Sequence, residues 1–266
     1  MAKLGFIGTG NMGGALAKAA SKVHSNELFL TNRHAEKAIR LAAELGGRVC
    51  SNAEAAGCDY IILGVKPRGM SELLRSLREI LEQRKRRRES FVIVSMATGT
   101  SIKQVQNWAG DIYPVIRIMP NTPVAIGEGT ILHACSEQVT EEQKRGFLEA
   151  MAESGLFVPL HESLIDAGSA VSGCGPAFVC MFLEAMADGA VACGLSREDA
   201  LRLSAQTMAG TAKYLLETGK HPGEVKDGVC SPGGTTIQGV RRLEEGGVRA
   251  DIMDAVIAAY EKNSSI

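Results

Sequence analysis

The fold of this chain is decided by residues 3–13, KLGFIGTGNMG. A short apolar run at 3–7 is typical of a buried strand, and residues 11–21 have the pattern of a helix. Between them, Gly8 permits a tight turn, Gly10 lets the backbone approach a pyrophosphate, and Gly13 allows the helix to pack closely on the strand. The pattern predicts a dinucleotide-binding strand–turn–helix unit; the alternative is a glycine-rich turn without a ligand.

Apolar, β-rich runs continue to alternate with helical patterns up to residue 159. The predicted strands are 28–31, 60–65, 91–95, 115–118 and 130–132, with a helix over 35–45. Beyond them only helices are predicted, over 177–193, 197–217, 235–245 and 250–262. We therefore expect an α/β fold in which an N-terminal Rossmann-type, doubly wound parallel sheet, residues 1–160, precedes an all-helical domain, residues 161–266.

Composition excludes several classes of protein. Hydrophobic residues make up 45% of the chain and charged residues 22%, and the net charge is -1, which gives no reason to expect nucleic-acid or membrane partners. No apolar stretch approaches the roughly 20 residues that span a bilayer, and no secretory signal precedes the first strand. Seven scattered cysteines without a C-x-x-C pair argue against disulfides and against a metal site. We expect a cytoplasmic protein.

The nucleotide site should extend from the glycine turn to the end of the second strand. Backbone amides at Asn11 and Met12 are expected to hold the phosphates at the helix start. After the second strand come Asn32 and Arg33 where an NAD-selective site would have a carboxylate. A guanidinium suits a 2′-phosphate, so NADPH is the expected cofactor, with NADH accepted more weakly. The alternative for Arg33 is an ordinary surface arginine.

Loops after later strands should complete this site, because ligands of open α/β sheets bind at the carboxyl ends of the strands. Val65, Lys66 and Pro67 follow the strand that ends at Gly64, and Lys66 is expected to contact cofactor or substrate unless it is a surface lysine. Small residues around Ala97 can line a flat nicotinamide. Asn121, between two prolines, could contact the nicotinamide carboxamide or the substrate; its alternative is a turn-forming role.

A second anion site is predicted within residues 227–237, DGVCSPGGTTI. Small and turn-forming residues precede a helical run, which leaves backbone N–H groups exposed at a helix start. A small carboxylate would fit there, and the alternative is a well-capped helix. The residues concerned are Ser231, Gly233, Gly234, Thr235 and Thr236.

Together these segments resemble pyrroline-5-carboxylate reductase. The resemblance is carried by residues 5–12, 65–67, 117–123, 172–178, 221–222 and 227–236. It implies reduction of 1-pyrroline-5-carboxylate to L-proline by hydride from NAD(P)H, the final step of proline biosynthesis. It also implies that the turn at 231–236 binds the substrate carboxylate, that Thr236 is the catalytic hydrogen-bond partner of the ring nitrogen, and that the helical domain forms homodimers which assemble into decamers. Cys174 stands where the family commonly has serine.

Two other functions are alternatives for a chain with this order of domains. A β-hydroxyacid dehydrogenase relies on a lysine in the helix that opens its second domain, yet no lysine occurs between Lys144 and Lys213. A nucleotide-sensing protein without activity would not need the turn at 231–236 beside an intact dinucleotide loop. Reduction of a protonated C=N bond needs mainly positioning and a partner for the nitrogen, so the lack of an obvious acid–base pair is expected.

Overall fold

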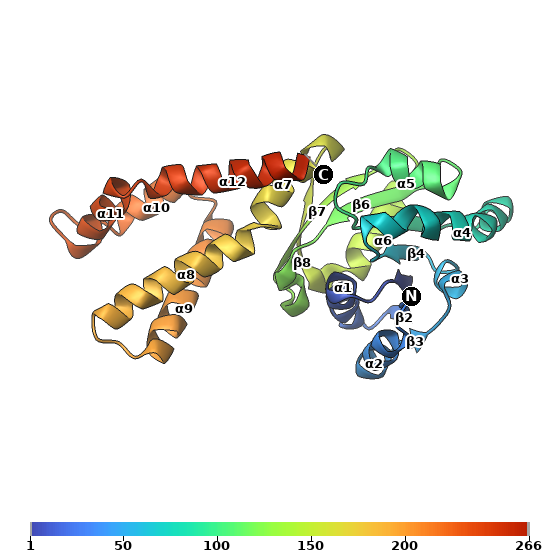
Figure 1. The fold of residues 1–266 in the computed structure, drawn as a ribbon, viewed down its shortest axis with the longest axis horizontal. Helices are drawn as coiled ribbons and strands as arrows, with labels where there is room; N and C mark the ends of the chain where they lie inside the picture. Colours follow the sequence, from blue (N-terminus) through green and yellow to red (C-terminus); the bar gives the residue numbers. More distant parts are fainter. Residues whose placement is uncertain (1, 265–266) are drawn as a thin grey trace. The chain divides into compact units, whose positions relative to one another are not determined.

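The computed structural model describes residues 2–264 (Figure 1). The chain forms two compact units, and we describe each by itself. The first unit comprises residues 2–173 with 262–264, and the second unit comprises Cys174–Glu261. The predicted boundary between a Rossmann-type domain, residues 1–160, and an all-helical domain, residues 161–266, stays a prediction.

A mixed β-sheet forms the centre of the first unit. Among the described residues it has eight strands in the order β3-β2-β1-β4-β5-β6-β7-β8. The predicted Rossmann-type α/β fold is thus confirmed, because β1 pairs in parallel with β2 on one side and with β4 on the other. The bounds are β1 Ala2–Ile7, β2 Asn26–Thr31, β3 Arg48–Val49, β4 Tyr60–Leu63, β5 Val92–Ser95, β6 Val115–Met119, β7 Gly129–Cys135 and β8 Gly155–Pro159.

The last two strands of the sheet, β7 and β8, run against the direction of the other six. β7 pairs antiparallel with β6, and β8 then pairs in parallel with β7. The link from Met119 to Gly129 contains only the short 3-10 helix η1 (Thr122–Ile126), which is too short for the crossover that a parallel neighbour needs. The predicted parallel sheet therefore holds for β1 to β6, and β7 and β8 depart from it.

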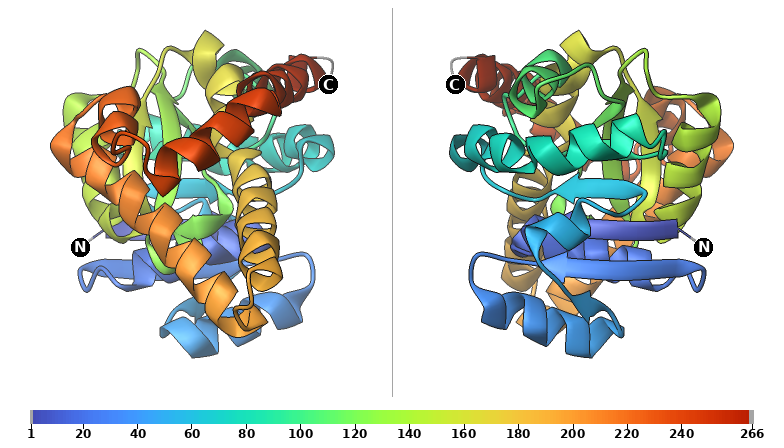
Figure 2. Two further views of the ribbon diagram at one scale, coloured as in Figure 1. Left: turned by 90° about the vertical axis from the view of Figure 1, so that its left-hand side faces the viewer. Right: turned by 90° about the vertical axis from the view of Figure 1, so that its right-hand side faces the viewer.

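Helices cover both faces of this sheet (Figure 2). On one face Leu16, Leu41 and Phe147, from α1, α2 and α6, are buried with Phe6 and Leu30 of the strands. The other face buries side chains from α3, α4, α5 and α7. These helices span α1 Asn11–Ser21, α2 Ala35–Leu45, α3 Asn52–Ala55, α4 Pro67–Arg86, α5 Ile102–Ala109, α6 Glu141–Ala150 and α7 Ile165–Ser172, with the 3-10 helices η2 Ala152–Ser154 and η3 Glu162–Leu164.

The second unit consists of helices. Their bounds are α8 Gly175–Ala192, α9 Arg197–Thr218, α10 Pro222–Gly228, α11 Thr235–Glu245 and α12 Val248–Ser264, the last ending in the first unit. Many large apolar side chains here are exposed in the single chain, with Met181 at 70% and Leu216 at 75%; others are Val179, Met186, Leu201, Leu203, Ile252, Met253 and Ile257. This unit therefore presents apolar surface that one chain does not bury.

One segment, Glu162–Ala192, is long and apolar enough to cross a membrane by length and composition. It includes α7 and α8, and only 17% of its most apolar window is buried in the single chain. The expectation that no stretch approaches spanning length is therefore wrong. Length and composition alone are weak evidence for a membrane span, because apolar helices that pack against protein pass the same test.

Candidate active site

Three glycines bring the turn after β1, the start of α1 and the end of β4 into direct backbone contact. Gly8 has φ 103°, and a Cβ there would lie 2.7 Å from the backbone of Gly64. A Cβ on Gly13 or on Gly64 would lie 2.1 Å or 2.2 Å from the carbonyl oxygen of Gly8. These short distances agree with the two roles predicted from the sequence, a tight turn at Gly8 and close packing of the helix at Gly13. The sequence pattern alone predicts no role for Gly64, although a glycine that ends a buried strand is a signal of close backbone approach.

Gly10 differs from its neighbours because the space around it is open. It is the N-cap of α1, and no described atom beyond its two chain neighbours lies within 4 Å of where its Cβ would be. We use the term bare helix start for a first turn that has neither a capping side chain nor an acidic residue among the described residues. α1 has a bare helix start, so the amides of Asn11 and Met12 and the helix dipole are available to an anion.

Asn32 ties the end of β2 to the glycine turn. Its Nδ2 donates to Thr9 Oγ1 at 3.1 Å, and its Oδ1 accepts from the His34 amide at 3.0 Å. The Gly8 amide donates to the carbonyl of Thr31 at 2.9 Å. Arg33 beside it is exposed and makes no hydrogen bond or ion pair with any other described residue. Its guanidinium is therefore available beside the turn that precedes α1.

The loop after β4 lies beside the loop after β1, since Ile7 and Leu63 are register partners at the ends of parallel strands. Lys66 is the exposed N-cap of α4 and Pro67 is its first residue. α4 likewise has a bare helix start over the residues described. Two bare helix starts thus follow neighbouring strands at the point where strand order reverses, which is where dinucleotides bind in such sheets.

The loop after β5 forms a tight turn in which the side chain of Ala97 is buried in the core. The Thr100 amide donates to the carbonyl of Ala97 at 3.3 Å, and Gly99 has φ 67°. Ala97 is 2% exposed and belongs to the core, whereas Met96 and Thr98 are partly exposed. If this loop lines a nicotinamide, its accessible side chains are those two and not Ala97, whose contact stays a prediction.

Asn121 is buried, and its amide is used within the first unit. Nδ2 donates to the carbonyl of Ser172 at 2.9 Å, and Oδ1 accepts from the Thr130 amide at 2.8 Å. The side chain therefore joins the loop after β6 to the last residue of α7 and to β7. This structural role is close to the turn-forming alternative, and a contact with cofactor or substrate stays a prediction.

The turn at 231–236 lies in the second unit, before α11. The Gly234 amide donates to the carbonyl of Ser231 at 3.0 Å, and Gly233 has φ 69°, as the third position of a type II turn requires. Gly234 is the N-cap of α11, and within the described chain no hydroxyl caps the helix and no acidic residue occupies its first turn. Thr235 and Thr236 are exposed. α11 thus has a bare helix start, and the capping alternative does not hold.

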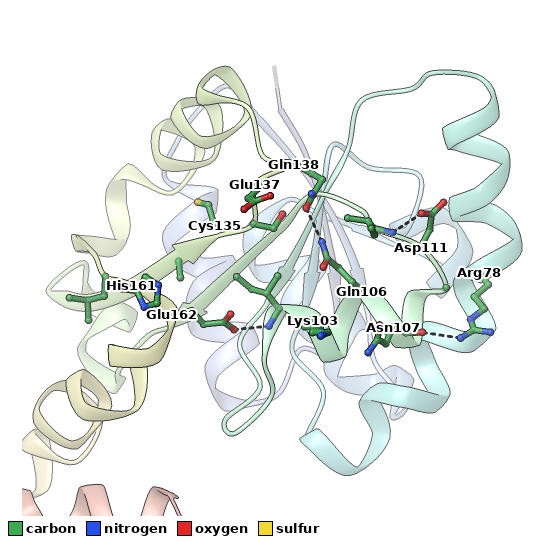
Figure 3. Close-up of a pocket in the computed structure, with 16 residues that line it drawn as sticks. Arg78, Lys103, Gln106, Asn107, Asp111, Cys135, Glu137, Gln138, His161 and Glu162 are labelled. Carbon is green, nitrogen blue, oxygen red and sulfur yellow. Dashed lines mark hydrogen bonds between the residues drawn. The ribbon is translucent and has the colours of Figure 1, made fainter.

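A separate pocket of about 920 Å³ lies along α5 (Figure 3). Its walls include Gln106 on α5, Cys135 at the end of β7 and Glu162 of η3. None of the residues predicted for the nucleotide or carboxylate sites lines it. This pocket is therefore not the predicted site.

Comparisons with known proteins agree with these features. The family model for pyrroline-5-carboxylate reductase dimerisation matches residues 162–266, and that for NADP oxidoreductase coenzyme F420-dependent matches residues 3–99. The pyrroline-5-carboxylate reductase of Methanosarcina acetivorans is 39% identical over 99% of this chain and 97% of its own length. That of Escherichia coli is 36% identical, covering 99% and 98%.

Solved structures give the same result. The Plasmodium falciparum pyrroline carboxylate reductase with NADP bound has a TM-score of 0.83 and 29% identity, covering 99% of this chain and 97% of that one. The pyrroline-5-carboxylate reductase from Coxiella burnetii has a TM-score of 0.89 and 29% identity, covering 99% and 98%. With relatives above 30% identity along nearly its whole length, this chain belongs to the pyrroline-5-carboxylate reductase family.

Proposed function

We propose that this protein reduces 1-pyrroline-5-carboxylate to L-proline with hydride from NADPH, as the final step of proline biosynthesis. Family membership supports the reaction, and the Plasmodium relative was solved with NADP bound. The observation that carries the proposal is a pair of helix starts that no side chain caps: the bare helix start after the glycine turn, and the bare helix start of α11.

The cofactor fits the first of these sites. The open space at Gly10 has room for a pyrophosphate, with Gly8 shaping the turn and the amides of Asn11 and Met12 donating to it. Arg33, next to Asn32, would pair with the 2′-phosphate, so NADH should bind more weakly. Val65, Lys66, Pro67, Ala97 and Asn121 would surround the nicotinamide half. When bound, NADPH supplies the hydride.

The substrate carboxylate fits the second site. Amides and hydroxyls of Ser231, Gly233, Gly234, Thr235 and Thr236 would hold it, because a bare helix start favours an anion without needing a cation. Thr236 Oγ1 would accept a hydrogen bond from the protonated ring nitrogen and so fix the orientation of the C=N bond. The protein thus contributes position and hydrogen bonding, and no strong general acid is required.

The second unit is a dimerisation region by its family match, and its exposed apolar side chains supply the surface for it. We propose a homodimer in which a second copy covers the apolar face of α8, and further assembly into a decamer. This arrangement also accounts for the apolar segment Glu162–Ala192 without a membrane. A cytoplasmic location, with neither membrane nor nucleic-acid partners, completes the proposal.

The test is the fall in absorbance at 340 nm when the purified protein is mixed with NADPH and racemic 1-pyrroline-5-carboxylate. Oxidation of NADPH with this imine, and not with keto acids, is expected. Turnover only with keto acids, or only of hydroxy acids with NADP⁺, would favour a hydroxyacid dehydrogenase. No turnover with any of them, but measurable binding of NADPH, would favour a nucleotide-sensing protein.

A further inference from the structure

Arg117 of β6 is a buried cation that joins two carboxylates from outside its strand. Its side chain is 5% exposed, and Nη2 donates to Asp166 Oδ1 at 2.9 Å while Nη1 lies 3.5 Å from Glu162 Oε1. Glu162 belongs to η3 and Asp166 to the first turn of α7. Arg117 Nε is buried without a partner among the described atoms. Neither proposed binding site uses this cluster.

Glu162 links this cluster to the start of α5. The same Oε1 accepts from the Ile102 amide, the first N–H of α5, at 2.6 Å (Figure 3). The loop between β5 and α5 is therefore held at one end by the sheet, at Ser95, and at the other end by this carboxylate. That loop includes the turn at Gly99, which we propose to lie against the nicotinamide.

Asp166 links Arg117 to the first turn of α7. Because Asn121 donates to the carbonyl of Ser172, β6 and the loop after it hold α7 at both ends, through Arg117 and through Asn121. The chain enters the second unit directly after α7, at Cys174, and that unit contains the proposed carboxylate turn. One guanidinium is thus linked to segments that lead to both proposed binding sites.

Stability alone is a poor explanation for this arrangement. Both carboxylates are about one third exposed, at 31% and 34%, so water could solvate them without Arg117. Burying a guanidinium with one nitrogen unsatisfied is unfavourable, and an apolar side chain of similar size at such a position is often at least as stable. What a planar guanidinium supplies, and an apolar side chain does not, is a fixed geometry between two partners.

We propose that Arg117 is a positioning residue for hydride transfer: through Glu162 it fixes the loop after β5 against the nicotinamide. The inference rests on the proposed function. A nicotinamide that is free to shift by about 1 Å reacts more slowly, by roughly 10- to 100-fold, even when the rest of the cofactor binds normally.

The experiment compares Arg117→Met with a matched control, Arg84→Met. Arg84 is also a buried, ion-paired arginine, but its Nη1 donates to the carbonyls of Ala56 and Cys58, which precede β4, whereas the cofactor loops follow the strands. For Arg117→Met we expect kcat to fall roughly 10- to 100-fold, with the Kd of NADPH changed by less than about threefold. The kinetic isotope effect with NADPH deuterated at the transferred position should rise, because hydride transfer becomes rate-limiting. Arg84→Met should lower the melting temperature and leave kcat and the isotope effect unchanged.

The Glu162→Gln variant tests the same inference, and it can be used if Arg117→Met does not fold. It should lower kcat and raise the isotope effect in the same direction. Adding it to Arg117→Met should cause little further loss, because both act through one contact. Wild-type kcat and isotope effect in either single variant would overturn the inference. Absence of imine reduction by the wild-type enzyme would instead contradict the proposed function, so the two failures are distinguishable.

Discussion

Alanine substitutions at Gly10 and at Gly13 should separate cofactor binding from folding. At Gly10 the new methyl group meets no described atom within 4 Å beyond the two neighbouring residues of the chain, and φ is -75°, which any L-residue adopts. The expected loss of unfolding free energy is therefore only the weaker N-cap preference of alanine, about 1 kcal/mol or less. The same methyl would occupy the space that we assign to the pyrophosphate. Losing one charge-assisted hydrogen bond there is worth about 1.5–3 kcal/mol, or roughly a 10- to 150-fold rise in the Kd of NADPH.

At Gly13 the methyl group would lie 2.1 Å from the carbonyl oxygen of Gly8, whereas an ordinary contact begins at 3.4 Å. α1 would have to move away from β1 by about 1 Å, and overpacking of this kind costs about 1–3 kcal/mol. The movement also withdraws the bare helix start from the cofactor. Gly13→Ala should therefore lose both stability and NADPH affinity.

Urea unfolding of the cofactor-free variants and fluorescence titration with NADPH measure the two quantities separately. Gly10→Ala should unfold near the wild-type urea midpoint and bind NADPH weakly, while Gly13→Ala should be altered in both measurements. Wild-type affinity for NADPH in Gly10→Ala would refute the placement of the pyrophosphate over the start of α1.

Other substitutions test the remaining parts of the proposal. Thr236→Ala should lower kcat by roughly 10- to 100-fold, with a smaller change in the Kd of NADPH, because a hydrogen bond to a charged nitrogen is lost; wild-type turnover would remove Thr236 from the mechanism. Arg33→Ala should weaken NADPH by about tenfold or more and leave NADH nearly unchanged, whereas equal losses would place Arg33 away from the 2′-phosphate. Burial, and secondarily Lys144, lowers the pKa of His133 below its ordinary value of 6.5, and neither ring nitrogen has a hydrogen-bond partner among the described atoms. The unfolded ring takes up its proton first, so unfolding free energy should be highest above about pH 6.5 and fall as the pH drops towards the folded-state pKa; His133→Phe should flatten that slope in urea unfolding, and an unchanged slope would argue against this assignment.

The fold could be predicted from the sequence where the determinants are local. α1, α2 and α11 begin and end where their patterns predict, because apolar spacing is reinforced by a glycine before α1, a glycine after α2 and glycines on both sides of α11. β3 and α10 were not predicted, since two and seven residues are too short for a periodic pattern. α3 was missed although its capping box, Ser51 with Glu54, is readable as S-x-x-E. The reversal of β7 follows from a short connection and not from its own composition.

The residues of the candidate site could likewise be predicted only where their structural constraints are local. Gly8 and Gly13 could be assigned because their constraint is steric and lies within one turn of chain. The contacts of Arg117 with Glu162 and Asp166, and of Asn121 with Ser172, join residues 45 to 51 positions apart. No spacing rule links such partners, so the sequence left Arg117 without a role. The contact of the Asn121 amide with Ser172 could not be read from the sequence, and its predicted contact with cofactor or substrate stays a prediction.

The second unit leaves apolar side chains uncovered in the single chain, and we therefore expect the stability of this protein to fall when it is diluted. By mass action, a protomer whose apolar surface is buried only by another copy loses part of its stability as the concentration falls. Activity measured at nanomolar and at micromolar enzyme would then refer to different mixtures of species. Specific activity, heat resistance and storage lifetime should therefore each be referred to a stated protein concentration.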